Sequence, residues 1–226
     1  ADDKLFKRLA TIYASNHEFM ASKQPFCGDR PFPGGITNGA HWYPLTGGME
    51  DFNYYWADCF EITIELTCCK YPEESELEGE YHANLESLLQ YIEQGYTAVR
   101  GKVYTSSAGQ IPTIEILSED DSGYQPKNIT GFQIQSDKSR TSFVYHRLLP
   151  PGAYKIRAST AEHTSAWQNI PEITQNQVFD FDFRANQASA ATNSPTSNNQ
   201  VTHQHNHQQL EQFFEKMTKT CPDIFR

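Results

Sequence analysis

The first residue that could take part in chemistry is a carboxylate, Glu65. It lies near the end of residues 59–66, CFEITIEL, where polar and apolar side chains alternate. This alternation predicts a β-strand whose polar face carries Glu61, Thr63 and Glu65. A carboxylate in that position either transfers protons in a cleft or faces water. Glu61 and Glu65 would lie roughly 13 Å apart on a regular strand, too far for the paired acids of a glycosidase, which need about 5–9.5 Å.

A second candidate is Tyr43, in the segment HWYPLTGGMEDF at residues 41–52. Gly47 and Gly48 follow it and would let the loop move. A phenol on a mobile loop can bind an amide or a carboxylate of a substrate. Tyrosine is also common in loops that have no function, so both interpretations stay open.

We assign no metal ligand to the histidines of this chain. Three histidines within residues 203–207 could hold a metal ion loosely, but they also lead into an apolar helical pattern that begins there.

Two helices and a long loop would have to position these residues. Apolar side chains at helical spacing follow Asp2 and Asp3, and a second such stripe covers residues 82–94 and ends before Gly95. Residues 24–56 are rich in glycine, proline and aromatic residues, which predicts an irregular loop. Loops of this length in a compact domain are usually functional.

From Ala98 onward the apolar period changes to two, which predicts a small antiparallel β-sandwich. In the last predicted strand the phenylalanines would face the core and the aspartates would face out. The predicted strands span residues 99–104, 113–117, 142–147, 154–158 and 178–183. Residues 185–202 have the composition of a flexible linker, and a new amphipathic helix follows them.

Composition and charge restrict the class of protein. The 226 residues carry a net charge of −10, which disfavours nucleic acid and anionic lipid as partners and otherwise serves solubility. No apolar run reaches the ~18 residues of a membrane span, and no signal peptide is recognisable. The acceptor triplet Asn128-Ile129-Thr130 permits glycosylation in a secreted protein, where the five cysteines would tend to form disulfides.

Several ordered motifs are similar to those of the regulatory zinc carboxypeptidases, the carboxypeptidase N/E/D/M group. They are GGITNGAHWY at 34–43, GGMEDFNY at 47–54, CFEITIEL at 59–66 and CCKYP at 68–72. The resemblance implies an α/β fold in which residues 1–95 form the C-terminal part of a mixed-sheet catalytic domain.

The second half of the chain resembles the all-β transthyretin-like domain that follows this catalytic domain. The match lies in GKV at 101–103, KNIT at 127–130 and RLLPPGAY at 147–154, and it implies a sandwich over residues 96–184. Residues 203–226 resemble the start of a further carboxypeptidase module. Several modules in tandem are typical of the carboxypeptidase D type.

The resemblance also assigns roles to individual residues. Glu65 would take a proton from zinc-bound water and pass it to the leaving amine, and Tyr43 would close over the end of the substrate. Thr63, Gly48 and Glu50 would line the pocket for a C-terminal Lys or Arg. Glu50 stands where the family pattern has Gln. Its carboxylate either pairs with the basic side chain or is a rim charge worth ~0–1 kcal/mol.

The zinc cofactor (Zn²⁺) and the cysteines follow the same resemblance. The family's zinc ligands, a His-x-x-Glu pair and a distant His, would lie upstream and not in this chain. Cys27 would pair with Cys68, and Cys69 with an upstream cysteine. Cys59 would be buried and free, and Cys221 would belong to the next module.

The implied function is that of a zinc metallocarboxypeptidase that removes C-terminal Lys or Arg from peptides. It would work in the secretory pathway, extracellularly or in the trans-Golgi, with membrane attachment only through segments outside this chain. The segment alone is expected to be inactive. One alternative is a non-catalytic peptide-binding or docking module of a multidomain protein. Another is that the sandwich alone serves as a folding or adhesion domain.

Overall fold

The structure is a computed structural model that describes residues 2–20, 22, 32–120, 123–133 and 141–184; for residues 120 and 123–133 only the backbone is described. Its residues divide into two compact units. The sandwich unit comprises the described residues of Ala1–Leu5, Met49–Glu61 and Gly95 onward, and the helical unit those of Phe6–Gly48 and Ile62–Gln94. The predicted linker and further module, residues 185–226, lie outside the described residues.

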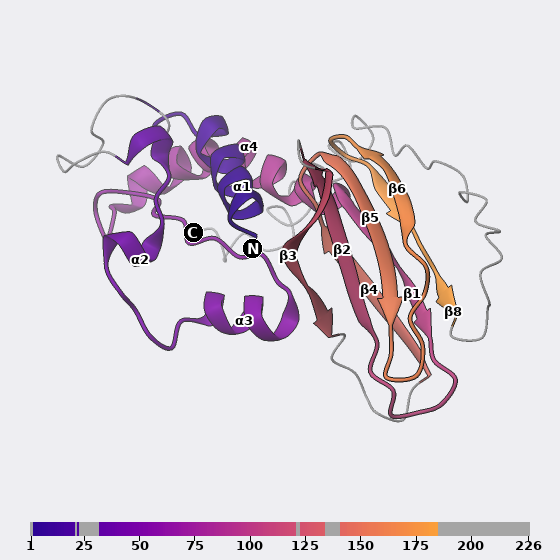
Figure 1. Cartoon of the computed structure of the whole chain (residues 1–226). Coiled ribbons are helices and arrows are strands. Elements are labelled where there is room, and N and C mark those ends of the chain that lie inside the picture. Colours follow the sequence, from indigo (N-terminus) through magenta and orange to yellow (C-terminus); the bar gives the residue numbers. More distant parts are fainter. Residues whose placement is uncertain (1, 21, 23–31, 121–122, 134–140, 185–226) are drawn as a thin grey trace, which may run out of the picture. The chain divides into compact units, whose positions relative to one another are not determined.

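The sandwich unit is built on two four-stranded sheets (Figure 1). One sheet has the order β4-β1-β7, with β8 also paired to β1, and the other has the order β3-β2-β5-β6. The strands of the first sheet are β1 (Ala98–Tyr104), β4 (Ser142–Leu148), β7 (Val178–Asp180) and β8 (Phe183–Arg184). Those of the second are β2 (Thr113–Asp120), β3 (Gly123–Gln133), β5 (Gly152–Ser159) and β6 (Gln168–Ile173).

The hydrophobic core of this unit is formed by the inward-facing residues of both sheets. The alternating burial of β4 and β5 follows the two-residue period of the sequence. Phe181 and Phe183 are buried as predicted, and Phe179 packs against the cluster. The buried cluster consists of Val99, Val103, Ile114, Ile116, Tyr145, Leu149, Tyr154, Ile156, Ala158, Ile170, Ile173, Phe181 and Phe183.

Strands were predicted at the positions of β1, β2, β4, β5 and β7–β8, and the structure confirms them, but β3 and β6 were not predicted. Pro126 interrupts the sequence of β3, and Pro171 that of β6. Proline has no N–H to donate, so within a sheet it is tolerated chiefly on edge strands. Both strands are in fact at the edges of the second sheet.

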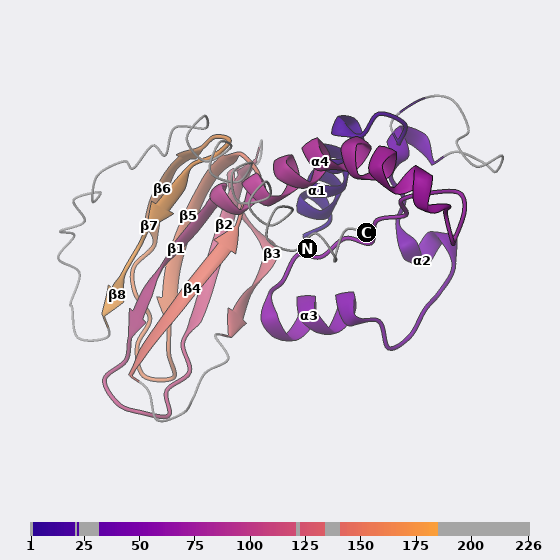
Figure 2. The ribbon, with the colours of Figure 1, turned by 180° about the vertical axis from the view of Figure 1, so that it is seen from behind.

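The first sheet corrects the prediction of a purely antiparallel sandwich. β4 runs antiparallel to β1, but β7 and β8 run parallel to it, and Figure 2 shows this sheet from behind. The predicted strand 178–183 is also divided in two. The Asp182 carboxylate accepts a hydrogen bond from the backbone N–H of Lys102 at 2.8 Å. Just after β7 ends, the Asp182 side chain thus accepts the hydrogen bond that a backbone carbonyl would accept in a regular strand pair.

The helical unit contains α1 (Asp3–Asn16) and α4 (Leu77–Glu93), which confirms both predicted helices. The two helices lie side by side in Figures 1 and 2. The Tyr13 hydroxyl donates to the Asn84 side-chain oxygen at 2.6 Å, and Leu9 and Leu89 are buried. Short 3-10 helices precede and follow α4, η2 (Glu74–Glu76) and η3 (Gln94–Tyr96). None of the described helices has the length and apolarity that a membrane crossing requires.

The region between these helices differs from the predictions. The segment predicted as a loop contains η1 (Pro33–Gly35), α2 (Gly39–Trp42) and α3 (Met49–Ala57). Glycines do not prevent these short helices: Gly34 and Gly35 lie within η1 and Gly39 begins α2, while Gly47 and Gly48 lie between α2 and α3. Conversely, the strand predicted at residues 59–66 is absent, because no described strand pairs with this segment. Its alternating pattern is present, but a strand forms only where a neighbour satisfies its backbone.

Candidate functional site

Tyr43 follows directly after α2. The Asn38 side chain caps this short helix by accepting hydrogen bonds from the backbone N–H groups of Ala40 (3.0 Å) and His41 (3.3 Å). Tyr43 is 51% exposed, and its ring contacts that of Trp42 edge-on with 5.0 Å between the centroids. The Tyr43 side chain is therefore half exposed, and its role in substrate binding stays a prediction.

The glycine turn lies between Tyr43 and α3. Gly47 has a φ of 79°, a left-handed conformation that glycine adopts without a steric penalty. Gly48 follows it, and Glu50 is exposed in the first turn of α3. A carboxylate there is favoured by the helix dipole, so the position suits Glu50 whether or not it binds a ligand.

Glu65 and Thr63 lie in the irregular segment that replaces the predicted strand, and both are exposed. Glu61, which precedes them, accepts a hydrogen bond from the Asn53 side-chain amide at 2.7 Å. Glu50 belongs to the sandwich unit, whereas the other four predicted site residues belong to the helical unit. Their convergence on one substrate pocket stays a prediction.

A metal site was not assigned from the sequence. Across residues 2–20, 32–119 and 141–184, no three His, Cys, Asp or Glu side chains are grouped so that they could hold a metal ion. The part of the chain that the structure describes therefore offers no donor set for zinc, and we derive no catalytic step through the metal. The predicted glycosylation site, Asn128, lies in β3, of which only the backbone is described.

The cysteines partly differ from expectation. Cys59 is free, but it is exposed rather than buried, because the segment around it is not a buried strand. Partial burial, and to a lesser degree the neighbouring Glu61, raise the pKa of its thiol. Cys69 is also free and exposed, while Cys68 is disulfide-bonded. Cys27 and Cys221 lie outside the described residues, so the Cys27–Cys68 pair stays a prediction.

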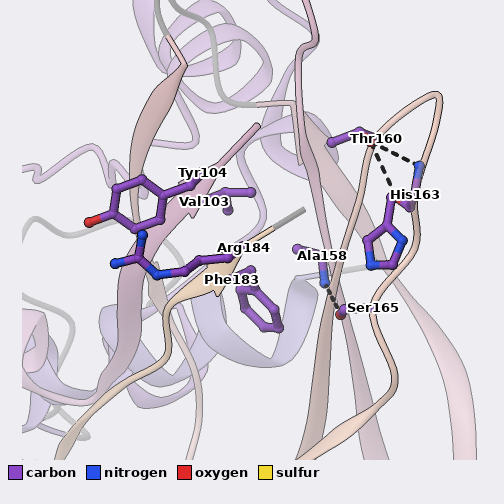
Figure 3. Close-up of a pocket in the computed structure, with 8 residues that line it drawn as sticks. All are labelled: Val103, Tyr104, Ala158, Thr160, His163, Ser165, Phe183 and Arg184. Atoms are coloured by element: carbon purple, nitrogen blue, oxygen red, sulfur yellow. Dashed lines mark hydrogen bonds between the residues drawn. The ribbon is translucent and has the colours of Figure 1, made fainter. Parts of the chain in front are cut away.

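The sandwich unit has a small hollow between its sheets, which Figure 3 shows. Arg184 lies over the ring of Tyr104 at 4.1 Å on one side. On the other, the turn from Thr160 to His163 and the Ser165 hydroxyl, which accepts from the Ala158 N–H at 3.1 Å, form the wall. The volume of about 20 Å³ holds little more than one water molecule, so this hollow is not a peptide-binding site.

A buried charged cluster of the sandwich unit was not predicted. Arg147, with a side chain only 3% exposed, pairs with Asp2 at 2.6 Å and with Asp58. The sequence contains a pattern that indicates a buried charge at Arg147. Phe143, Tyr145 and Arg147 are successive residues on the same face of a strand, so a core-facing face ends in an arginine. Such a buried charge requires partners, and only the fold shows which they are.

Comparison with known proteins shows similarity to the zinc carboxypeptidases. The model of the zinc carboxypeptidase family matches residues 1–87. Carboxypeptidase D of Mus musculus is 39% identical over 187 residues, which is 81% of this chain and 13% of that protein. Carboxypeptidase M of Mus musculus is 40% identical over 178 residues, 79% of this chain and 38% of that protein.

The catalytic chain of carboxypeptidase N from Homo sapiens is 40% identical over 162 residues, 70% of this chain and 31% of that protein. The chain thus spans between about an eighth and two fifths of the length of these relatives. The similarity extends well past residue 87, so it includes much of the sandwich as well as the family match.

Proposed function

We propose that this chain is a segment of a metallocarboxypeptidase, an enzyme that would remove single residues from the C-terminus of peptides. The match of the zinc carboxypeptidase family model to residues 1–87 supports the proposal. The observation that carries the proposal is a sequence identity of about 40% to three kinds of carboxypeptidase over most of the chain. The predicted site residues Tyr43 and Glu65 fall inside the matched range.

The proposed substrates are peptides that end in Lys or Arg. Glu50 at the exposed start of α3 would supply a carboxylate for the basic side chain, and Thr63 and Gly48 would line the same pocket. The net charge of −10 favours the approach of basic peptides. Tyr43 would cover the peptide end, since its phenol is exposed next to the glycine turn.

Glu65 is the proposed proton carrier. It would accept a proton from the attacking water and deliver it to the leaving amine, a contribution worth on the order of 10²–10⁴-fold in rate. The zinc ion that the family implies would polarise the scissile carbonyl, with ligands supplied from outside the described residues.

The sandwich and the location belong to the same proposal. Two four-stranded sheets over residues 98–184 support a transthyretin-like domain. The disulfide at Cys68 and the acceptor triplet at Asn128 support passage through the secretory pathway, with an extracellular or trans-Golgi location. Membrane attachment would depend on segments outside this chain.

The test of catalysis uses a polypeptide in which this chain continues a complete zinc carboxypeptidase domain. We expect release of free arginine from a peptide ending in Arg, and loss of this release with a chelator. Glu65→Gln should lower kcat by about 10²–10⁴-fold. Glu61→Gln is the matched control, because it removes a nearby carboxylate that is hydrogen-bonded to Asn53, and it should change kcat little. Equal activity of Glu65→Gln and wild type would exclude the proposed role.

The chain by itself is expected to be inactive. Incubation of the 226-residue chain with the same peptide and added Zn²⁺ should release no arginine. Chelator-sensitive release from the chain alone would show that the segment contains a complete site.

A non-catalytic docking module is the second candidate, and one observation favours it. The side chains of Met49, Phe52, Tyr55 and Trp56 on α3 are all exposed, and Tyr55 is 77% exposed. Contiguous exposed apolar side chains often mark a protein-binding surface. If the longer polypeptide bound a peptide ending in Arg without cleaving it, this candidate would replace the enzyme.

A further inference from the structure

The residue that follows α3, Asp58, has an unusual backbone conformation. Asp58 has a φ of 54°, in the left-handed region where helix-terminating positions usually carry glycine or asparagine. Its N–H donates to the Tyr54 carbonyl at 3.2 Å, and the N–H of Cys59 donates to the Asn53 carbonyl at 3.2 Å. An aspartate here incurs a backbone cost that glycine would avoid, so its carboxylate needs an explanation.

The carboxylate of Asp58 is paired with the guanidinium of Arg147. Arg147 lies on β4, and its other terminal nitrogen donates to Asp2 at 2.6 Å. The exposed fraction of the side chain is only 3% for Arg147, 17% for Asp58 and 9% for Asp2. One buried guanidinium therefore joins three segments that are distant in sequence: the start of the chain, the end of α3 and strand β4.

Two aromatic residues complete this arrangement. The Tyr54 hydroxyl donates to the same Asp2 carboxylate at 2.6 Å, and burial, followed by this hydrogen bond, raises the pKa of Tyr54 to about 12. Phe60 is buried with its ring 4.7 Å from the Arg147 guanidinium carbon. Arg147 thus contacts residues both within α3 and just beyond it.

We propose that Arg147 is a positioning residue: the β-sandwich uses it to hold α3 and the chain that follows. α3 would otherwise be weakly held, since none of its side chains is fully buried. If the proposed function holds, the sandwich thereby orients the helix whose first turn carries Glu50. The sandwich would then position one of the proposed substrate-binding residues.

The test is made on the full 226-residue chain by limited proteolysis with chymotrypsin, which cleaves after the aromatic residues of α3. Arg147→Met keeps much of the side-chain volume and removes the charge. Loss of one partner from a buried ion pair should raise the cleavage rate within α3 at least about 100-fold. Arg100→Met is the matched control: Arg100 forms the exposed pair with Asp180 at 2.8 Å, and its loss should leave α3 protected.

Amide hydrogen exchange distinguishes local release from general unfolding. In Arg147→Met, amides of α3 should exchange faster while those of β2 and β5 keep wild-type protection. Arg147→Lys retains one charge but cannot bridge both carboxylates, so it should restore only part of the protection. Loss of protection in β2 and β5 to the same extent as in α3 would overturn the proposal, because Arg147 would then act only on global stability.

Asp58 supplies an independent variant. Asp58→Asn keeps a residue that tolerates the left-handed backbone and removes only the charge. It should increase cleavage within α3, despite the better backbone preference. Unchanged cleavage in both Asp58→Asn and Arg147→Met would refute the proposed role. None of these measurements depends on peptidase activity, so failure of the proposed enzyme function would not be mistaken for failure of this inference.

Discussion

At the scale of single residues, His17 is a titratable group that is almost entirely buried. It lies just after α1 and is 4% exposed. Its Nδ1 atom accepts hydrogen bonds from the backbone N–H groups of Phe19 (3.2 Å) and Met20 (3.3 Å). Because Nδ1 must be unprotonated to accept them, the folded state holds a neutral imidazole. Burial lowers the pKa of His17, while the nearby Glu80 and Glu18 carboxylates raise it to a smaller extent.

This arrangement predicts that stability falls at acidic pH. The folded-state pKa of His17 lies below the unfolded value of about 6.5, so the unfolded chain binds the proton more readily. The contribution is fully present above pH ~6.5 and is lost as the pH falls through the folded pKa. Amide exchange in α1, compared between pH 7.5 and pH 5, should show the loss of protection.

The control variant is His17→Gln, whose side-chain oxygen can still accept a hydrogen bond but does not titrate. It should reduce the difference in α1 protection between the two pH values. If the variant and the wild type lost protection equally, other groups would be responsible for the pH dependence.

At the scale of elements, the contact of β1 with the segment joining β7 and β8 depends on Gly101. A Cβ atom at this position would overlap the carbonyl oxygen of Phe181. The same carbonyl accepts a hydrogen bond from the buried Tyr145 hydroxyl at 2.7 Å, so it cannot shift freely. Only glycine allows the backbone of Phe181 to approach β1 this closely.

We predict that Gly101→Ala destabilises the sandwich by about 1–3 kcal/mol or more, the usual cost of overpacking. Urea unfolding monitored by circular dichroism would measure it. Gly79→Ala in α4 is the control: no atom lies within 4 Å of the added methyl group, and alanine should stabilise the helix by roughly 0.5–1 kcal/mol. A neutral Gly101→Ala would mean that β7 and β8 adapt easily.

Also at the scale of elements, the alternation of apolar residues predicted some strands correctly and others not. The strands with uninterrupted alternation were predicted, because a two-residue period follows directly from one buried face. β3 and β6 were not predicted, because each contains a proline that interrupts the strand pattern. Proline is tolerated in both because they are edge strands. At residues 59–66 the alternation was present without a strand, since pairing depends on a neighbour that the local sequence does not specify.

At the scale of the whole molecule, the family match and the compact units do not share boundaries. The match covers residues 1–87, yet Met49–Glu61 belongs to the sandwich unit. Among the described residues, the main buried hydrophobic cluster of that unit lies between Val99 and Phe183, whereas Leu5 and Phe60 are buried outside it. This cluster thus draws its residues from the strands and their connections rather than from the segment that Arg147 holds.

This predicts that residues 96–184 fold alone with a single cooperative thermal transition. The transition should lie at a lower temperature than that of the sandwich in the whole chain, because the isolated sandwich keeps the Arg147 guanidinium but lacks its partners Asp2 and Asp58. Arg147→Met differs in that it removes the guanidinium itself. Differential scanning calorimetry would measure both. A broad, non-cooperative transition would show that the sandwich needs the preceding segments to fold.

The sequence by itself indicated the resemblance to zinc carboxypeptidases, five of the strand positions in the sandwich and the two main helices, because periodicity and ordered motifs are local properties of the chain. The tertiary structure alone decided that β7 and β8 run parallel to β1, and that Arg147 binds Asp2 from 145 positions away. The physical reason is that a buried charge must be paired, but the local sequence does not show which residue will pair with it. Packing brings distant segments together, and only then is the choice of partner made.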